Sequence, residues 1–202
     1  MFVKTPSLAE FLFPSIIWKN KTTEKKIWLT FDDGPDEVIT VFLLNVLKKL
    51  QIKATFFLIG KQVEKYPLLT KMILDNGHYI GNHSYSHING LLKSNKNYLS
   101  DIDRAQQFIN SKIFRPPYGK IRPIQLRNLK RQYKIIMWDV FSWDFKENIS
   151  SEKLYTNVIN NVEKGSIIVF HNNMKSYRNL NKNLEKILLK LQKEGYSFST
   201  TW

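Results

Sequence analysis

The sequence predicts a single α/β domain whose strands are mostly parallel, and two observations carry this prediction. Short apolar runs alternate with longer amphipathic segments from residue 25 to residue 202, a pattern typical of strands joined by helical crossovers. Polar side chains gather directly after five of the apolar runs, and the carboxyl ends of parallel strands are where such folds place their ligand chemistry. A doubly wound sheet and a barrel both fit a count of about seven strands.

The first half of the domain shows the alternation clearly. The apolar run KKIWLTF (25–31) predicts a strand, and EVITVFLLNVLKKLQ (37–51) has apolar residues at helical spacing. KATFFLIG (53–60) predicts a strand that is buried on both faces. We expect one helix through QVEKYPLLTKMILDN (62–76), ending at the glycine that follows it, and then a short strand at HYIG (78–81).

The second half continues in the same way. NYLSDIDRAQQFINS (97–111) has one polar and one apolar face and predicts a helix. SEKLYTNVINNVEK (151–164) predicts another helix, with Ser151 as its N-cap. Further strands are expected at 112–115, 133–138, 165–171 and 196–200, and further helices at 121–132 and 183–195.

Residues 1–24 form an apolar and basic lead-in segment before the domain at residues 25–202. Its most apolar stretch, FLFPSIIW (11–18), is shorter than the ~20 residues of a membrane-spanning helix and contains Pro14. The segment lacks the basic start, continuous apolar run and cleavage site of a signal peptide. We expect it to pack against the domain, with contact to a membrane interface as the alternative.

The composition excludes some chemistry and favours some partners. The chain has no cysteine, which excludes disulfides, thiolate metal sites and a thiol nucleophile. With 31 Lys and Arg against 17 Asp and Glu, the net charge is +14, which favours anionic partners such as a cell-wall polymer or a membrane surface. The lysines are spread along the chain, which is more typical of a solvated surface. No motif for reading nucleic acid is present, so nucleic-acid binding is not expected; we expect a monomer.

The candidate functional residues lie in the five polar clusters that follow predicted strands. Three of the four histidines fall inside these clusters. The fourth, His78, is expected to be structural. The clusters are Asp32-Asp33, HSYSH (83–87), RPPYG (115–119), WDVFSWDF (138–145) and FHN (170–172).

HSYSH and the aspartate pair together indicate a metal site. His83 and His87 are spaced so that both imidazoles lie on one face of a helix. A carboxylate from Asp32 or Asp33 completes a two-histidine, one-acid set with a fourth position open for water or substrate. Adjacent aspartates repel each other. A cation relieves that repulsion, because one aspartate binds it while the other stays free as a base.

The motifs TFDDGP, HSYSH, RPPYG, WDVFSWDF and IIVFHN, in this order, resemble the five motifs of the polysaccharide deacetylases, carbohydrate esterase family 4. The resemblance runs from about residue 28 to the C-terminus and includes linking segments such as KATFFLIG. It implies a distorted (β/α) barrel of about seven strands, with residues 25–202 as the catalytic domain. It also implies a metal-dependent hydrolase that removes acetyl groups from an N-acetylglucosamine-type glycan, such as peptidoglycan or chitin. The implied metal is most often Zn²⁺, with Co²⁺ or other divalent ions as alternatives.

The resemblance assigns the polar residues to roles. Asp33, His83 and His87 would hold the metal. Asp32 would be the general base, and Arg115 would pair with it and keep it ionised, as a nearby guanidinium should.

Three further residues would complete the chemistry. The backbone N–H of Tyr118 would stabilise the oxyanion together with the metal, in a turn fixed by prolines and a glycine. His171 would be the general acid that protonates the leaving amine. Asp144 would orient His171, and Asp139 is the second candidate for that orienting role.

The substrate-binding positions implied by the motifs are Phe145, Val169, Pro117 and Trp143, and the first two would line the pocket for the acetyl methyl group. The chain departs from the family in two places. Phe145 stands where the fourth motif often has tryptophan, and Asn172 stands where the residue after the final histidine is often acidic. These differences are expected to affect the shape of the acyl pocket and the pH optimum rather than the metal site.

Other functions stay open at this stage. The same site could act on O-acetyl esters or on a small non-sugar amide. A non-catalytic barrel that binds glycans or surfaces is a different class, but the complete set of base, ligands and acid argues against it. A cytoplasmic location, peripheral attachment to a membrane, and export by a leader not visible here are all compatible with the sequence.

Overall fold

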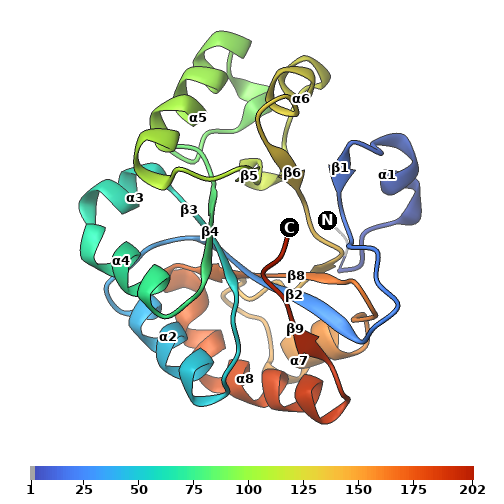
Figure 1. Cartoon of the computed structure of the whole chain (residues 1–202). Coiled ribbons are helices and arrows are strands. Elements are labelled where there is room, and N and C mark those ends of the chain that lie inside the picture. Colours follow the sequence, from blue (N-terminus) through green and yellow to red (C-terminus); the bar gives the residue numbers. More distant parts are fainter. Residues whose placement is uncertain (1–2) are drawn as a thin grey trace.

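The centre of the molecule is a curled, parallel half-barrel surrounded by helices (Figure 1), in the computed structural model that describes residues 3–202. Eight strands follow the order β1-β6-β5-β4-β3-β2-β8-β7, and a ninth, β9, pairs with β2. The predicted distorted barrel is thereby confirmed. The strands are β1 (Ile16–Ile17), β2 (Lys26–Asp33), β3 (Thr55–Leu58), β4 (Tyr79–Asn82), β5 (Ile113–Phe114), β6 (Lys134–Ile136), β7 (Val140–Phe141), β8 (Ile167–Asn172) and β9 (Ser197–Phe198).

The helices lie around the outside of the curled sheet (Figure 1). They are α1 (Ser7–Leu12), α2 (Ile39–Lys49), α3 (Gly60–Lys65), α4 (Pro67–Asp75), α5 (Asn95–Ile109), α6 (Pro123–Leu129), α7 (Ser151–Ile159) and α8 (Met174–Lys193), with 3₁₀ turns η1 (Gly90–Leu92) and η2 (Pro117–Gly119). Most of them connect one parallel strand to another, as the alternating sequence pattern predicts.

The lead-in segment contributes to the sheet. β1 pairs in parallel with β6, and the residues before α1 run along the outer edge of β7. There the N–H of Phe141 donates to the carbonyl of Val3 at 2.7 Å, and the N–H of Thr5 donates to the carbonyl of Asp139 at 2.8 Å. These contacts cover a strand edge that would otherwise expose unpaired backbone groups.

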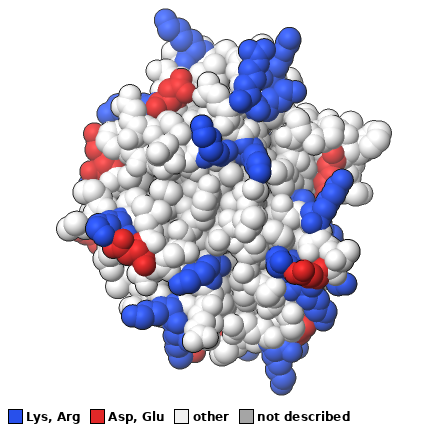
Figure 2. Space-filling view, in the orientation of Figure 1, with Lys and Arg blue, Asp and Glu red and all other residues white. Residues whose placement is uncertain are grey.

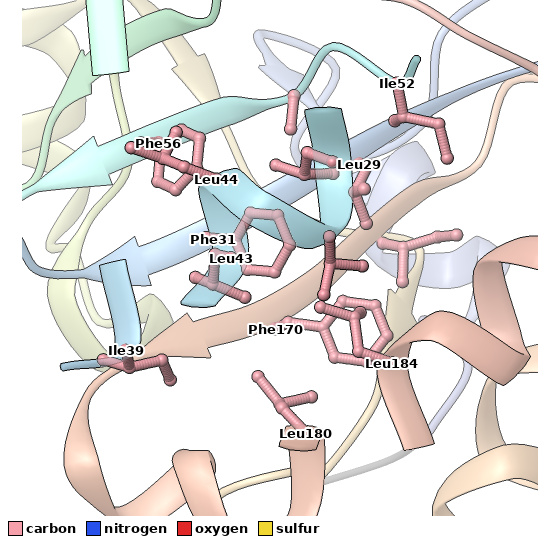
Figure 3. Packing of buried hydrophobic residues seen from close by; sticks show 14 of the residues in the cluster. Leu29, Phe31, Ile39, Leu43, Leu44, Ile52, Phe56, Phe170, Leu180 and Leu184 are labelled. Carbon is pink, nitrogen blue, oxygen red and sulfur yellow. The ribbon is translucent and has the colours of Figure 1, made fainter. Parts of the chain in front are cut away.

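Buried side chains form one layer on each side of the strands. On β8, Ile168 and Phe170 join the layer between the sheet and the helices, whereas Ile167 and Val169 join the layer inside the curl. Figure 3 shows Phe31, Phe56 and Phe170, from three neighbouring strands, facing leucines of α2 and α8. The rings stack at centroid distances of 5.2 Å and 5.9 Å, and each fully buried phenylalanine stabilises the fold by roughly 2 kcal/mol.

Three helix predictions need correction. The helix expected at 62–76 is two helices, α3 and α4, that meet at Tyr66 (φ −126°, ψ 60°), because Pro67 disfavours helical geometry in the residue before it. The N-cap of α7 is Ser150, whose hydroxyl accepts from the N–H of Lys153, and not Ser151. The last helix begins at Met174 instead of residue 183.

The surface combines spread basic charge with exposed apolar side chains, including those of α1. Figure 2 shows Lys and Arg scattered over this face of the molecule, with fewer acidic groups between them. On α1, Leu8, Phe11 and Leu12 are 62%, 80% and 57% exposed. Among residues 3–202, none of the helices has both the length and the hydrophobicity that a membrane span requires.

Candidate active site with an aspartate–histidine metal triad

A cavity of about 670 Å³ opens where β2 and β8 end, and residues from all five polar clusters line it. The sequence singles out part of its lining: Asp32, Asp33, His83, His87, Tyr118, Phe145 and His171. The folded chain adds other residues, among them Gln62, Trp138, Phe141, Asn173, Met174 and Lys175. The prediction that these clusters meet at the carboxyl ends of the strands is therefore correct.

A sharp bend at the end of β2 separates the two aspartates. Asp32 continues the strand, in register with His171 of β8. Asp33 and Gly34 have positive φ angles of 75° and 47°, so the chain turns there and re-aims the Asp33 side chain. Glycine is required after it, because a Cβ on Gly34 would lie 2.1 Å from Nδ2 of Asn172 and φ is in the left-handed region.

Asp33, His83 and His87 come together as a potential metal triad. Oδ1 of Asp33 lies 3.3 Å from Nε2 of His87 and 3.8 Å from Nε2 of His83, and the three ligand atoms all lie within 4.8 Å of one another. Nδ1 of His83 donates to the carbonyl of Arg115 at 2.7 Å. That bond leaves Nε2 with a free lone pair, which is how ligating histidines are usually oriented. Burial, with the adjacent His87, lowers the pKa of His83 to about 3, so the imidazole is neutral.

The histidines are on a loop, and the prediction that they share a helical face is wrong. Residues 83–87 have no helical structure, and Ser84 and His87 have φ angles of 62° and 54°. Asp101 of α5 holds the loop in place, because its carboxylate accepts from the N–H of Tyr85 at 2.9 Å and from the hydroxyl of Ser86 at 2.6 Å. The spacing still brings the rings together, with centroids 5.0 Å apart.

The other aspartate of the pair is bound to a buried guanidinium. Nη1 of Arg115 donates to Oδ1 of Asp32 at 2.5 Å and to Oγ1 of Thr30 at 2.8 Å, and Nη2 donates to the carbonyl of Met137 at 2.9 Å. Arg115 is completely buried. Burial lowers its pKa while the charge of Asp32 raises it. Removing one partner of such a buried ion pair strongly destabilises the folded protein, because the other charge is then left uncompensated.

His171, on β8, and Asp144, in the loop after β7, form a second charged pair. Nδ1 of His171 lies 2.8 Å from Oδ1 of Asp144, whose Oδ2 accepts from the backbone N–H of His171 at 2.7 Å. Burial alone would lower the pKa of His171, but Asp144, with smaller contributions from the two aspartates of β2, raises it to about 9. The alternative partner, Asp139, instead bonds to Lys4 at 2.7 Å and to the hydroxyl of Ser166.

The turn after Arg115 presents Tyr118 to the cavity. Tyr118 has a positive φ of 60°, and its ring centroid lies 4.5 Å from that of His87. The hydrogen bonds within the turn come from the N–H groups of Gly119 and Lys120, so the turn does not use the N–H of Tyr118. Pro117, the first residue of the turn, is buried.

Aromatic side chains form the apolar wall beside His171. The rings of Phe145 and Phe141 lie 4.9 Å and 5.6 Å from the imidazole, in edge-on orientations. Trp143 packs behind them, 5.2 Å from Phe141 and 5.6 Å from Phe145. Val169 is completely buried in the inner layer, and the cavity lining contains neither Val169 nor Trp143 nor Pro117.

Sequence reasoning missed some residues that touch the site. Nδ2 of Asn173 donates to Oδ2 of Asp33 at 2.6 Å, although Asn173 directly follows the FHN cluster. Phe141 lies inside the fourth motif but was not singled out. By contrast, His78 lies outside the cavity lining, accepts from the N–H of Ala54 at 3.2 Å, and has its pKa lowered to about 4 by burial and Lys53.

The fold and the site together define an α/β-barrel hydrolase with a candidate divalent-metal centre. The family model described as polysaccharide deacetylase matches residues 19–135, more than half of the chain. The chain belongs to this family of deacetylating hydrolases, as its motifs predict.

Two curated relatives and one solved structure show the similarity in detail. A peptidoglycan-N-acetylglucosamine deacetylase of Bacillus cereus is 37% identical over 87% of this chain and 66% of its own length. The peptidoglycan-N-acetylmuramic acid deacetylase PdaA of Bacillus subtilis is 32% identical over 89% of this chain and 71% of its own. The Bc1960 peptidoglycan N-acetylglucosamine deacetylase structure has a TM-score of 0.86 at 32% identity, covering 96% of this chain and 94% of that one. The chain thus spans just under two thirds of the first relative.

Proposed function

We propose that this protein is a metal-dependent deacetylase that removes N-acetyl groups from the N-acetylglucosamine residues of peptidoglycan. The observation that carries this proposal is the division of the aspartate pair. Asp33 faces two histidines, whereas Asp32 is bound to Arg115, so adjacent carboxylates are equipped for different tasks. The 37%-identical relative and the Bc1960 structure are both named as peptidoglycan N-acetylglucosamine deacetylases, which supports peptidoglycan as the substrate.

The triad fits a divalent metal, and we propose zinc. Two imidazole nitrogens and one carboxylate oxygen converge, which is a donor set typical of catalytic zinc with one position left open. When bound, the ion would supply a water of lowered pKa and would polarise the acetyl carbonyl. The hydrogen bond from His83 to the Arg115 carbonyl orients one ligand before any metal arrives.

Two side chains are placed to move protons. Oδ1 of Asp32 is occupied by Arg115, so Oδ2 is the atom that accepts the proton of the attacking water. Nδ1 of His171 is held by Asp144, so Nε2 donates the proton to the amide nitrogen as the C–N bond breaks. A histidine that stays protonated at neutral pH suits this task, since an amine leaves poorly without a proton.

The rest of the cavity would bind the acetyl group. The backbone N–H of Tyr118 donates to the carbonyl oxygen as negative charge develops on it, and the fixed turn keeps this donor in place before the reaction begins. Phe145 and Phe141 form an apolar wall next to His171, which suits the methyl group. Asp32, His171 and this wall would therefore surround the amide of a bound acetyl group.

For the location, the proposal is peripheral attachment to an anionic membrane surface through α1. Its exposed apolar side chains offer contact with the interfacial region of a bilayer. Basic residues lie beside it, since a hollow next to α1 is lined by Glu10, Lys19, Lys21, Glu163 and Lys164, among others. The net charge of +14 adds long-range attraction to anionic lipid.

The function is tested by acetate release from peptidoglycan and from N-acetylglucosamine oligomers, with zinc-loaded protein beside a chelator-treated control. Zinc-dependent release is expected, and mass spectrometry of the digested product would show glucosamine rather than muramic acid. Release of acetate only from O-acetyl esters would move the activity to ester substrates. No release from folded, zinc-loaded protein would refute the deacetylase proposal.

A further inference from the structure

One side chain at the start of α8 joins the candidate metal triad to a helix. Nδ2 of Asn173 donates to Oδ2 of Asp33 at 2.6 Å. The other end of the same amide, Oδ1, accepts from the backbone N–H of Ser176 at 3.1 Å, which makes Asn173 the N-cap of α8. The amide is thus held at both ends. One hydrogen bond is donated by its nitrogen and the other is accepted by its oxygen, and together they define its orientation.

We infer that Asn173 is a positioning residue for the metal: it fixes Asp33 so that a single carboxylate oxygen faces the histidines. This inference rests on the proposed function, because it assumes that Asp33, His83 and His87 bind an ion. It goes beyond that function by assigning a role to a residue that lies outside the five motifs.

The geometry explains why the Asp33 carboxylate needs a hydrogen-bond donor. The carboxylate stands on a bend with φ of 75° at the end of β2, with its Oδ1 3.3 Å and 3.8 Å from the two imidazole nitrogens. A carboxylate that is free to rotate can bind a metal through one oxygen or through both. With Oδ2 bonded to Asn173, Oδ1 is the oxygen that faces the two histidines. The fourth position then stays open for water and substrate.

Asn173 is itself held by rigid structure. It connects β8, which carries His171 and Asn172, to the 20-residue helix α8, and its backbone is extended (φ −145°, ψ 162°). β8 is in register with β2 from Trp28 to Asp33. The bond between Asn173 and Asp33 therefore spans two neighbouring strands at their carboxyl ends, and it fixes the ligand in the metal-free protein.

The test separates the two bonds of the amide. Asn173→Ser keeps an N-cap oxygen but is too short to reach Asp33, whereas Asn173→Ala loses both bonds. As a matched control, Ser150→Ala removes the N-cap of α7, where the hydroxyl accepts from the N–H of Lys153. The zinc dissociation constant is measured by competition with a chromophoric chelator, the Co²⁺ absorption spectrum reports coordination, and thermal unfolding of the metal-free protein reports stability.

The expected result is that both Asn173 variants bind zinc about 10–100-fold more weakly, the range typical for loss of a residue that supports a metal ligand, with a changed Co²⁺ spectrum. Only Asn173→Ala and Ser150→Ala should lower the unfolding temperature appreciably, and Ser150→Ala should bind zinc normally. Wild-type zinc affinity and an unchanged spectrum in Asn173→Ser would overturn the inference while leaving the proposed function intact. If the wild-type protein binds no zinc, the inference and the proposed metal site both fail.

Discussion

The charged pair of His171 and Asp144 makes the most quantitative prediction. Asp144 is completely buried and bonds to the imidazole at 2.8 Å, and the pKa of His171 rises from its ordinary 6.5 to about 9. Replacing Asp144 with asparagine keeps the shape of the side chain but removes its charge. Burial, which opposes the protonated form, then lowers the pKa of His171 below its ordinary value.

This change in pKa has a defined effect on stability. Because the folded protein holds the proton of His171 more tightly than the unfolded chain does, protonation stabilises the fold. The stabilisation is complete below pH 6.5 and is lost as the pH rises through about 9. Its full size is about 3 kcal/mol. In Asp144→Asn this contribution disappears, so the stability of the variant should not fall across that pH range.

The assay is urea unfolding of chelator-treated protein from about pH 7 to pH 9, together with NMR titration of the histidine ring signals. This window avoids the buried tyrosines, whose raised pKa values lower stability only near pH 10 and above. No cysteine is present to titrate in this range. The matched control is Asp139→Asn, since Asp139 is also buried but bonds to Lys4; its stability should still fall with rising pH. A wild-type His171 that titrates near 6.5, or a decline that persists in Asp144→Asn, would show that Asp144 does not raise the pKa of His171.

Three other predictions follow from the same structure. His87→Ala should abolish tight zinc binding and acetate release together, measured by metal analysis and acetate assay; a variant that retained both would not contain the proposed triad. Phe145→Trp should enlarge the apolar wall beside the acid and change the ratio of acetyl to propionyl hydrolysis, and an unchanged ratio counts against this wall as the acyl site. The double variant Leu8→Ser/Phe11→Ser should weaken co-sedimentation with anionic phospholipid vesicles by about tenfold or more. The control Leu92→Ser, at another exposed leucine, should bind like the wild type. Equal binding by the wild type, the double variant and the control would exclude α1 as the anchor.

Much of the fold could be predicted because its strands are continuous apolar runs. KKIWLTF and GSIIVFH coincide closely with β2 and β8, since strands buried on both faces need apolar residues at every position. Short edge elements escaped prediction. β1 and β7 have only two residues each, and they are strands because neighbouring chain segments supply partners, which a local pattern does not reveal.

The sequence predicted which residues form the site better than it predicted their local structure and contacts. The spacing of His83 and His87 correctly placed them together, but for the wrong reason, because positive φ angles and the bonds to Asp101 shape a loop there instead of a helix. The contact between Asn173 and Asp33 joins residues 140 positions apart. Only the parallel register of β2 and β8 brings them together, so no sequence signal local to either residue indicates it.

Asp32 and Asp33, although adjacent in sequence, are proposed to have separate tasks. The most direct measurement is zinc content and acetate release for Asp32→Asn and Asp33→Asn side by side, with circular dichroism to confirm that both variants fold. Asp32→Asn should keep zinc but release acetate at least about 100-fold more slowly, as expected for loss of a general base. Asp33→Asn should lose zinc. Full turnover by Asp32→Asn, or equal zinc content in the two variants, would contradict this division of tasks.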